Sequence, residues 1–302
     1  MKHFYSLNDY NLKTFGRKLY KLSISGGFTC PNRDGTKGVG GCIFCSEGGS
    51  GDFAESAEKS VTQQLCDAKR RVEKKMKDTS GQAFIAYFQS FTGTYAPTEK
   101  LRELFFEAIN WEGTAVLSIA TRPDCISEET LDLLEELNNI KPVWIELGLQ
   151  TSNEATAKII NRCYGNEVYE SCVRALRARG ITVITHMILG LPGETYDDMI
   201  GTVKYINSVG TDGIKFQLLH ILKGTALSYL SYTTLSMEEY IDALIGCISH
   251  LDPETVVHRI TGDGPKNLLI SPLWSADKKR VLNAVNKVMR ERNVRQGSEI
   301  QN

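Results

Sequence analysis

Short apolar segments alternate with longer helical patterns from about residue 20 to residue 218, and this alternation constrains the fold more than any other feature of the chain. A short apolar run is typical of a buried strand, whereas apolar residues three or four positions apart indicate a helix packed on one face. We therefore expect an α/β protein, a partial or full parallel (β/α) barrel of about six repeats. The functional residues of such a barrel lie at the carboxyl ends of its strands.

The expected strands share an apolar composition and are bounded by turn or helix-start residues. They cover Lys21–Ile24, Ala83–Phe88, Ala115–Ala120, Val143–Leu149, Thr182–Leu189 and Gly213–Leu218. Helical patterns follow them at about residues 57–77, 98–110, 127–138, 153–162, 166–179 and 195–208. Helix-start signals support this pattern: Ser127 precedes two glutamates, and Ser236 with Glu239 forms a capping box.

The alternation stops after residue 218. Downstream we expect a helix at about 236–251, a short segment Thr255–Arg259, a Gly/Pro turn at 261–265 and a final helix at about 275–291. The sequence therefore predicts a barrel core with an N-terminal lead-in over residues 1–220. A mostly helical extension over residues 221–302 is expected to cover the barrel.

Composition restricts the surroundings of the protein. No apolar run approaches the roughly 18 residues of a membrane helix, and the first residues lack the apolar stretch of a secretory signal. We therefore expect a cytoplasmic protein without a membrane partner, in which the eight cysteines are not paired as disulfides. The net charge of -1 favours a small-molecule substrate over nucleic acid. The basic segment Asp277–Arg295 is interpreted as a solvated helix, with an RNA-facing patch as the alternative.

Cys30, Cys42 and Cys45 lie in one Gly-rich loop after the first expected strand. A Cys-x-x-Cys pair places two thiolates on one tight turn, and the glycines allow the chain to bring the third close. A structural zinc site normally needs four protein ligands, and no further Cys or His follows before Cys66. Three cysteines suit a 4Fe-4S cluster that leaves one iron open for a ligand. Zinc and plain buried thiols remain the alternatives.

The cysteine loop is the first of an ordered series of loop motifs at the ends of the expected strands. This series resembles the YhcC-like branch of the radical S-adenosylmethionine (SAM) superfamily, which is related to the radical SAM domain of the catalytic subunit of elongator. The resemblance covers about residues 4–275, and the wide spacing between the first two cysteines is characteristic of this branch. The motifs are the loop through Ala54, then Tyr87–Tyr95, Ala120–Cys125, Trp144–Thr151 and His186–Thr195.

The resemblance implies both cofactors. Cys30, Cys42 and Cys45 would hold the 4Fe-4S cluster, and an electron donor such as flavodoxin or ferredoxin would supply the electron that cleaves SAM into a hydrogen-abstracting radical. Gln89 and Ser90 replace the Gly-Gly-Glu that usually binds the SAM amino group. The residues expected to contact SAM are Phe44, Gln89, Ser90, Ser118, Glu146, Gln150, Ile188 and Leu191.

The substrate is expected to contact polar residues at the open end of the barrel. The candidates are Asp52, Arg122, Asp124, Gln217, His220, His258 and Asp263. Cys125 follows the same site loop, whereas the other cysteines are interpreted as core thiols. The most specific implication of the resemblance is a queuine lyase, which converts the base queuine to the base preQ1. The alternatives are a radical SAM enzyme that modifies RNA, such as tRNA, and a noncatalytic zinc-stabilised binding protein.

Overall fold

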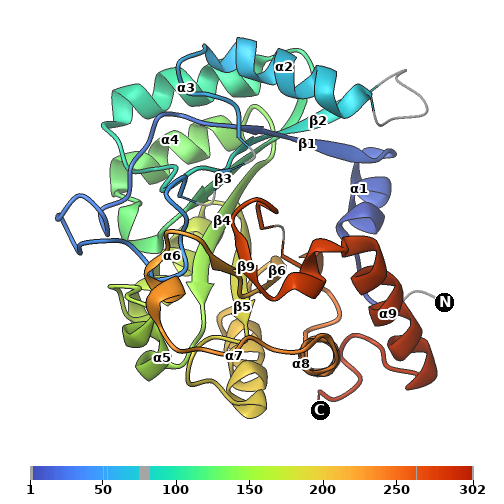
Figure 1. Cartoon of the computed structure of the whole chain (residues 1–302). Coiled ribbons are helices and arrows are strands. Elements are labelled where there is room, and N and C mark those ends of the chain that lie inside the picture. Colours follow the sequence, from blue (N-terminus) through green and yellow to red (C-terminus); the bar gives the residue numbers. More distant parts are fainter. Residues whose placement is uncertain (1–2, 50, 53, 75–81, 263, 301–302) are drawn as a thin grey trace.

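The computed structural model describes residues 3–49, 51–52, 54–74, 82–262 and 264–300. Its centre is a seven-stranded parallel sheet that curls into a half-barrel (Figure 1). The strands in spatial order are β1 (Leu19–Ile24), β2 (Ala83–Phe88), β3 (Thr114–Thr121), β4 (Val143–Gln150), β5 (Thr182–Leu189), β6 (Gly213–Leu218) and β8 (Val256–Arg259). All six expected strands are therefore present in the expected parallel arrangement.

Helices cover the outer face of this sheet (Figure 1). They are α2 (Val61–Glu73), α3 (Thr98–Asn110), α4 (Glu128–Asn138), α5 (Glu154–Ile159), α6 (Asn166–Ala178) and α7 (Tyr196–Val209). Because side chains alternate between the two faces of a strand, every second strand residue packs against these helices. The remaining strand residues point into the interior of the half-barrel. Apolar side chains such as Val116, Trp144 and Ile184 pack together there.

The seventh strand comes from the C-terminal part of the chain. Helix α8 (Met237–Ser249) leads to β8, which pairs with β6 through Gly213 and Val256. The sequence predicted only a short segment here, because a four-residue strand that ends in His258 and Arg259 has a weak apolar signal. The described structure thus extends the expected sheet of about six strands by one. The boundary between core and extension near residue 220 remains a prediction.

Two further features close the half-barrel. Strands β7 (Ile221–Leu222) and β9 (Leu269–Ser271) form an antiparallel ribbon, and α9 (Lys278–Glu291) follows it. The short helix α1 (Leu7–Phe15) lies within the expected N-terminal lead-in, begins with a capping box and lies against β8. Its Tyr10 ring meets the ring of Trp144 edge-on at 5.9 Å, near the amino ends of the strands. No helix in the described ranges is both long and apolar enough to cross a membrane.

Candidate active site

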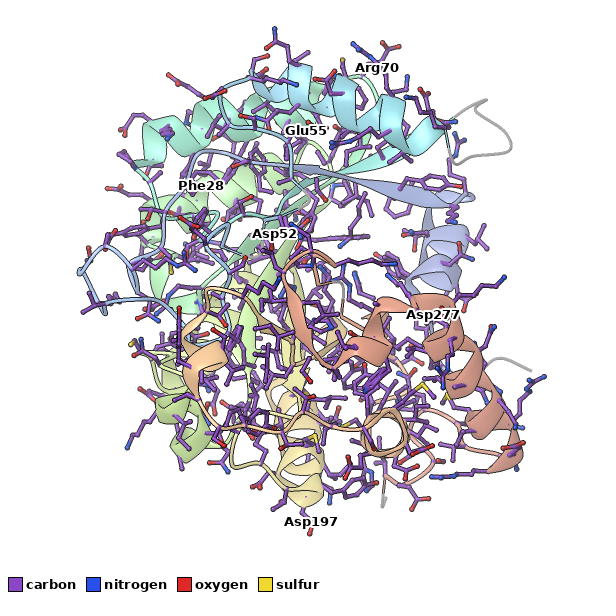
Figure 2. All side chains as sticks on the ribbon, in the orientation of Figure 1. Phe28, Asp52, Glu55, Arg70, Asp197 and Asp277 are labelled. Carbon is purple, nitrogen blue, oxygen red and sulfur yellow. The ribbon has the colours of Figure 1, made fainter. Side chains whose placement is uncertain are left out.

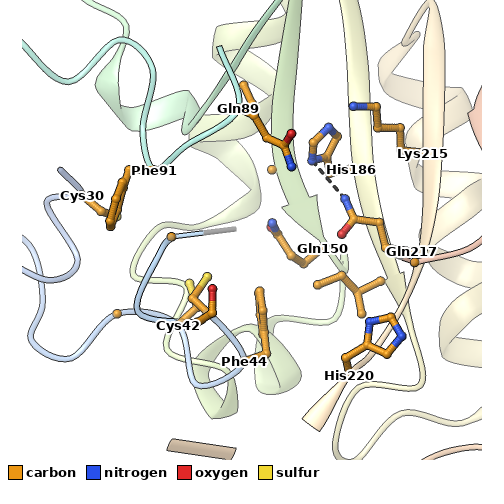
Figure 3. A pocket seen from close by; sticks show the side chains of 18 of the residues that line it. Cys30, Cys42, Phe44, Gln89, Phe91, Gln150, His186, Lys215, Gln217 and His220 are labelled. Carbon is orange, nitrogen blue, oxygen red and sulfur yellow. Dashed lines mark hydrogen bonds between the residues drawn. The ribbon is translucent and has the colours of Figure 1, made fainter. Parts of the chain in front are cut away.

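The carboxyl ends of the strands open into a pocket. Its volume is about 1450 Å³ when the open solvent space at its mouth is included. The cysteine loop forms one side of the pocket, and polar side chains from the strands form the other (Figure 3). Gly262, Gly264 and Pro265 of the C-terminal turn border it as well. The predicted residues that line it are Cys30, Cys42, Phe44, Cys45, Asp52, Gln89, Arg122, Glu146, Gln150, Ile188, Gln217 and His220. Figure 2 shows Asp52 among all the side chains of the molecule.

Several predicted residues lie elsewhere. Ser118 is fully buried and donates a hydrogen bond to Glu146, and Leu191 packs behind Ile188. Asp124 is paired with Arg122, and Ser90 is buried beside Gly51. His258 faces a separate cavity at the amino ends of the strands, which it lines with Tyr10 and Trp144. Asp263 lies outside the described residues.

Backbone hydrogen bonds and one arginine shape the cysteine loop. The Cys45 N–H donates to the Cys42 carbonyl at 3.0 Å, which forms the tight turn expected for a Cys-x-x-Cys pair. The Arg33 guanidinium donates to the carbonyls of Cys45, Ser46 and Glu47. It also lies over the Phe91 ring, with 5.4 Å from Cζ to the ring centroid. The loop is therefore folded around a side chain that the sequence analysis did not single out.

A second segment, Asn161–Tyr164, ties the cysteine loop to the end of β4. The Asn161 amide donates to the Gly41 carbonyl at 2.8 Å. Arg162, which is 1% exposed, donates to the carbonyls of Leu149 at 3.0 Å and Thr151 at 2.7 Å. The Tyr164 hydroxyl donates to the Gly148 carbonyl. Sequence reasoning missed this segment, because a polar Asn-Arg pair in a loop has no periodic signal.

The arrangement of the cysteines fits a 4Fe-4S cluster. All three line the same pocket from one loop, and thiolates are the ligands that such clusters require. The described residues hold no group of three metal-ligating side chains gathered tightly enough for a single ion. A 4Fe-4S cluster does not need the three thiolates to converge on one metal ion, because each thiolate binds a different iron of the cluster. The hydrogen bond to Cys45 and burial both raise the pKa of Cys42, so metal binding at this thiol would release a proton.

A buried ion cluster occupies the interior below the cysteines. Glu146 of β4 is fully buried, and its Oε1 accepts from Lys21 Nζ at 2.7 Å and from Ser118 Oγ at 2.8 Å. Its Oε2 lies 2.8 Å from His186 Nε2 and also accepts from Lys215. Both oxygens of the carboxylate that was expected to bind SAM therefore already have two partners each.

The charges of the cluster determine its protonation. Burial opposes ionisation of Glu146, but the charges of Lys21 and Lys215 hold the pKa of this carboxyl well below its usual value. Burial, together with the charge of Lys215, lowers the pKa of His186 to about 4, so this imidazole is neutral at pH 7. Burial also lowers the pKa of Lys215. Lysines at inward-facing positions of otherwise apolar strands were the signal that could have revealed this cluster.

Arg122 contributes a second polar group beside the cysteines. Its Nε and Nη2 each donate to Asp124 at 2.9 Å, and its guanidinium lies over the Tyr164 ring, 4.7 Å from the centroid. Lys37 of the cysteine loop pairs with the same carboxylate at 3.2 Å. At the opposite side of the pocket, His220 Nε2 lies 3.0 Å from the Ser275 hydroxyl. Asp124 therefore orients Arg122 and anchors the loop at the same time.

The half-barrel, with three cysteines at the carboxyl ends of its strands, defines the architecture of an iron-sulfur enzyme that binds SAM. Two family models match the chain: "Radical SAM superfamily" over residues 29–206 and "Radical_SAM C-terminal domain" over residues 211–291. The chain belongs to the radical SAM superfamily, whose enzymes use a 4Fe-4S cluster and SAM. This membership excludes the alternative of a noncatalytic zinc-stabilised protein.

Individual proteins of similar sequence or fold support this family membership. "Uncharacterized protein YtqA" of Bacillus subtilis is 44% identical over 99% of this chain and 94% of its own length. "Protein YhcC" of Escherichia coli is 34% identical over 95% of this chain and 92% of its own, which confirms the resemblance to the YhcC-like branch. The solved structure of archaeal Methanocaldococcus infernus Elp3 is similar in fold, with a TM-score of 0.70 at 17% identity. That alignment covers 92% of this chain and 64% of the Elp3 chain.

Proposed function

We propose that this radical SAM enzyme removes a hydrogen atom from a small polar substrate, and that this substrate is the free base queuine. In this reaction the bond between the amine nitrogen and the cyclopentenediol ring of queuine is cut. The nitrogen gains a hydrogen to give the base preQ1, and the five-carbon ring leaves as a separate product with one further unsaturation. Cys30, Cys42 and Cys45 would hold a 4Fe-4S cluster, which would supply the electron for the cleavage of SAM. Flavodoxin or ferredoxin would deliver that electron in the cytoplasm.

The observation that carries this proposal is the composition of the pocket walls. The cysteines lie on one side of the pocket. Gln89, which directly follows β2, lies on the other side with Gln150 of β4 and Gln217 of β6 (Figure 3). The pocket is open on one side and is lined both by the cysteine loop and by the ends of the strands, and the proposal places SAM and a second small molecule next to each other in it. The C-terminal turn borders the pocket and would help to exclude water from a radical.

The proposed roles follow the position of each side chain. Phe44 and Ile188 form an apolar wall that suits the adenine of SAM, with Leu191 packed behind them. Asp52 lines the pocket and accepts a hydrogen bond from Ser46 at 2.9 Å. Its carboxylate would read the amidine-like edge of a deazaguanine base. His220, held by Ser275, would contact a hydroxyl of the diol.

The substrate is tested by anaerobic incubation with SAM and a reductant. Queuine and queuosine-containing tRNA are supplied separately, and 5'-deoxyadenosine and preQ1 are followed by mass spectrometry. We expect both products with queuine and neither with the Cys42→Ala variant. Product formed with tRNA but not with queuine would refute the proposal and indicate an enzyme that modifies RNA. The absence of preQ1 with either substrate would refute the assignment of queuine.

A further inference from the structure

Gln217 and His186 form a hydrogen bond at the wall of the pocket. Gln217 lies in β6 and His186 in the neighbouring strand β5, and both side chains point inward. The distance from Gln217 Nε2 to His186 Nδ1 is 3.2 Å (Figure 3). The other ring nitrogen, Nε2, lies 2.8 Å from Glu146 Oε2. The three side chains therefore form a chain from the buried ion cluster to the pocket.

The ion cluster determines which nitrogen of His186 carries the proton. Glu146 is ionised, so both of its oxygens are acceptors, and they already accept from Lys21, Lys215 and Ser118. The His186 Nε2 that faces this carboxylate must therefore be the N–H donor. The imidazole is neutral at pH 7, so its Nδ1 has no proton and is an acceptor.

The protonation of His186 in turn fixes the amide of Gln217. Only the NH2 group of an amide donates, so this group faces His186 Nδ1 and the carbonyl oxygen Oε1 is turned away from it. The reverse orientation would place two acceptors against each other. Among the residues that the structure describes, none donates to Gln217 Oε1. The side chain lines the pocket and is only partly buried.

We infer that Gln217 is a specificity residue whose carbonyl oxygen is held toward the pocket by His186 and Glu146 and accepts a hydrogen bond from an N–H or O–H group of the substrate. His186 is the positioning residue. The inference deepens the proposed function, on which it rests for the location of the substrate. It also gives the buried ion cluster a purpose, since the cluster sets the direction of a hydrogen bond at the pocket wall.

The orientation of the amide can be tested without turnover. ¹⁵N spectra of the histidine-labelled protein at pH 7 distinguish a protonated from an unprotonated ring nitrogen. The signal of His186 is assigned from its loss in the His186→Gln variant. We expect a neutral ring with the proton on Nε2. A proton on Nδ1, alone or in an imidazolium, would overturn the inference even if queuine proved not to be the substrate.

The acceptor role is tested with a pair of variants at one position. Gln217→Met removes the acceptor, whereas Gln217→Asn keeps both groups of the amide on a side chain one carbon shorter and is the control. With queuine as the probe, we expect Gln217→Met to raise KM by about 3- to 30-fold and to change kcat less than about 3-fold. Gln217→Asn should raise KM less than Gln217→Met does.

Two further measurements test which group donates to Gln217 and whether that group belongs to the substrate or to SAM. The first N–H donor to remove from queuine is its exocyclic amine. The wild-type enzyme should have a higher KM for the analogue that lacks this amine than for queuine, whereas Gln217→Met should have similar KM values for both. Equal discrimination by both proteins would overturn a contact with that donor. The affinity for SAM alone, measured by equilibrium dialysis, should be the same in all three proteins. A loss of SAM affinity in Gln217→Met would assign the acceptor to SAM and overturn its role in substrate specificity.

Discussion

Lys21 Nζ lies 2.7 Å from Glu146 Oε1, although the two residues are 125 positions apart in the sequence. Lys21 belongs to β1 and Glu146 to β4, and Lys215 of β6 contacts the other carboxylate oxygen. The half-barrel is thus crossed by a buried ion cluster that joins strands from both halves of the sheet. Buried ion pairs of this kind contribute little net stability when intact, but removal of one partner leaves an uncompensated charge.

Glu146→Gln is therefore expected to destabilise the protein strongly. The substitution keeps the shape of the side chain but removes the only carboxylate that contacts both lysines in the described structure. We expect the free energy of unfolding, measured by urea denaturation, to fall by about 3–5 kcal/mol. Glu136→Gln is the matched control, because Glu136 pairs with Arg102 on the exposed surface. An equal effect of both substitutions would contradict a structural role for the cluster.

The three loop cysteines are expected to act as a set. Replacement of Cys30, Cys42 or Cys45 by Ala should each lower the iron content from about four atoms per chain and abolish the formation of 5'-deoxyadenosine. Iron analysis of anaerobically prepared protein and mass spectrometry provide the two measurements. Cys66→Ala, in α2 away from the pocket, is the control that should keep both properties. A triple variant with full iron content and turnover would refute the assignment of these ligands.

The strands were predictable because their signal is local. The outer side chains of each strand meet helices, so apolar residues such as Ile145, Leu147 and Leu149 of β4 recur in a way that the sequence displays directly. Helix α1 was missed and β8 was expected only as a short segment, because both are short and lie against parts of the chain that are distant in sequence. Their neighbourhood joins Ser6 to Val257, a pairing that no local pattern indicates.

The site was predictable where the chemistry of one residue is unusual in its setting. A carboxylate in the apolar strand β4 pointed to Glu146, and three cysteines in a Gly-rich loop pointed to a metal cluster. The partners Lys21, Lys215 and His186 were not found, because their role depends on how the curl of the sheet brings inward-facing side chains of β1, β5 and β6 to the Glu146 carboxylate of β4. His258 shows the converse, since its position on β8 brings it to the amino ends of the strands.

Arg162→Lys is expected to loosen the support of the cysteine loop. The Arg162 side chain is 1% exposed and donates to three backbone carbonyls, a fork that a lysine ammonium does not reproduce. We expect the free energy of unfolding to fall by about 3 kcal/mol and the iron content to decrease, because the neighbouring Asn161 holds the loop. Arg174→Lys, on the exposed side of α6, should match the wild type in both measurements. Unchanged iron content in Arg162→Lys would separate this segment from cluster binding.

Glu194 is expected to make stability fall as pH rises. Both of its carboxylate oxygens are buried without a hydrogen bond of good geometry, and the Thr151 hydroxyl is the one group that favours their ionised form among the described residues. Burial raises the pKa of Glu194 to about 7 in the folded protein, above the usual value of 4.5. The folded state therefore binds more protons than the unfolded state between these two values. The stability from this group is full below pH 4.5 and is lost as the pH rises through 7.

Glu194→Gln removes this titration, so the stability of the variant relative to the wild type should increase at high pH. We expect the free energy of unfolding of the variant minus that of the wild type to be about 2–3 kcal/mol larger at pH 8 than at pH 5. The comparison with the wild type at each pH cancels the opposite trend from His186, whose lowered pKa makes stability rise between about pH 4 and 6.5. Glu299→Gln, an exposed carboxylate, is the control and should follow the wild type at both pH values. If the difference between Glu194→Gln and the wild type were the same at pH 5 and pH 8, Glu194 would titrate as an ordinary carboxyl and its burial would have no energetic consequence.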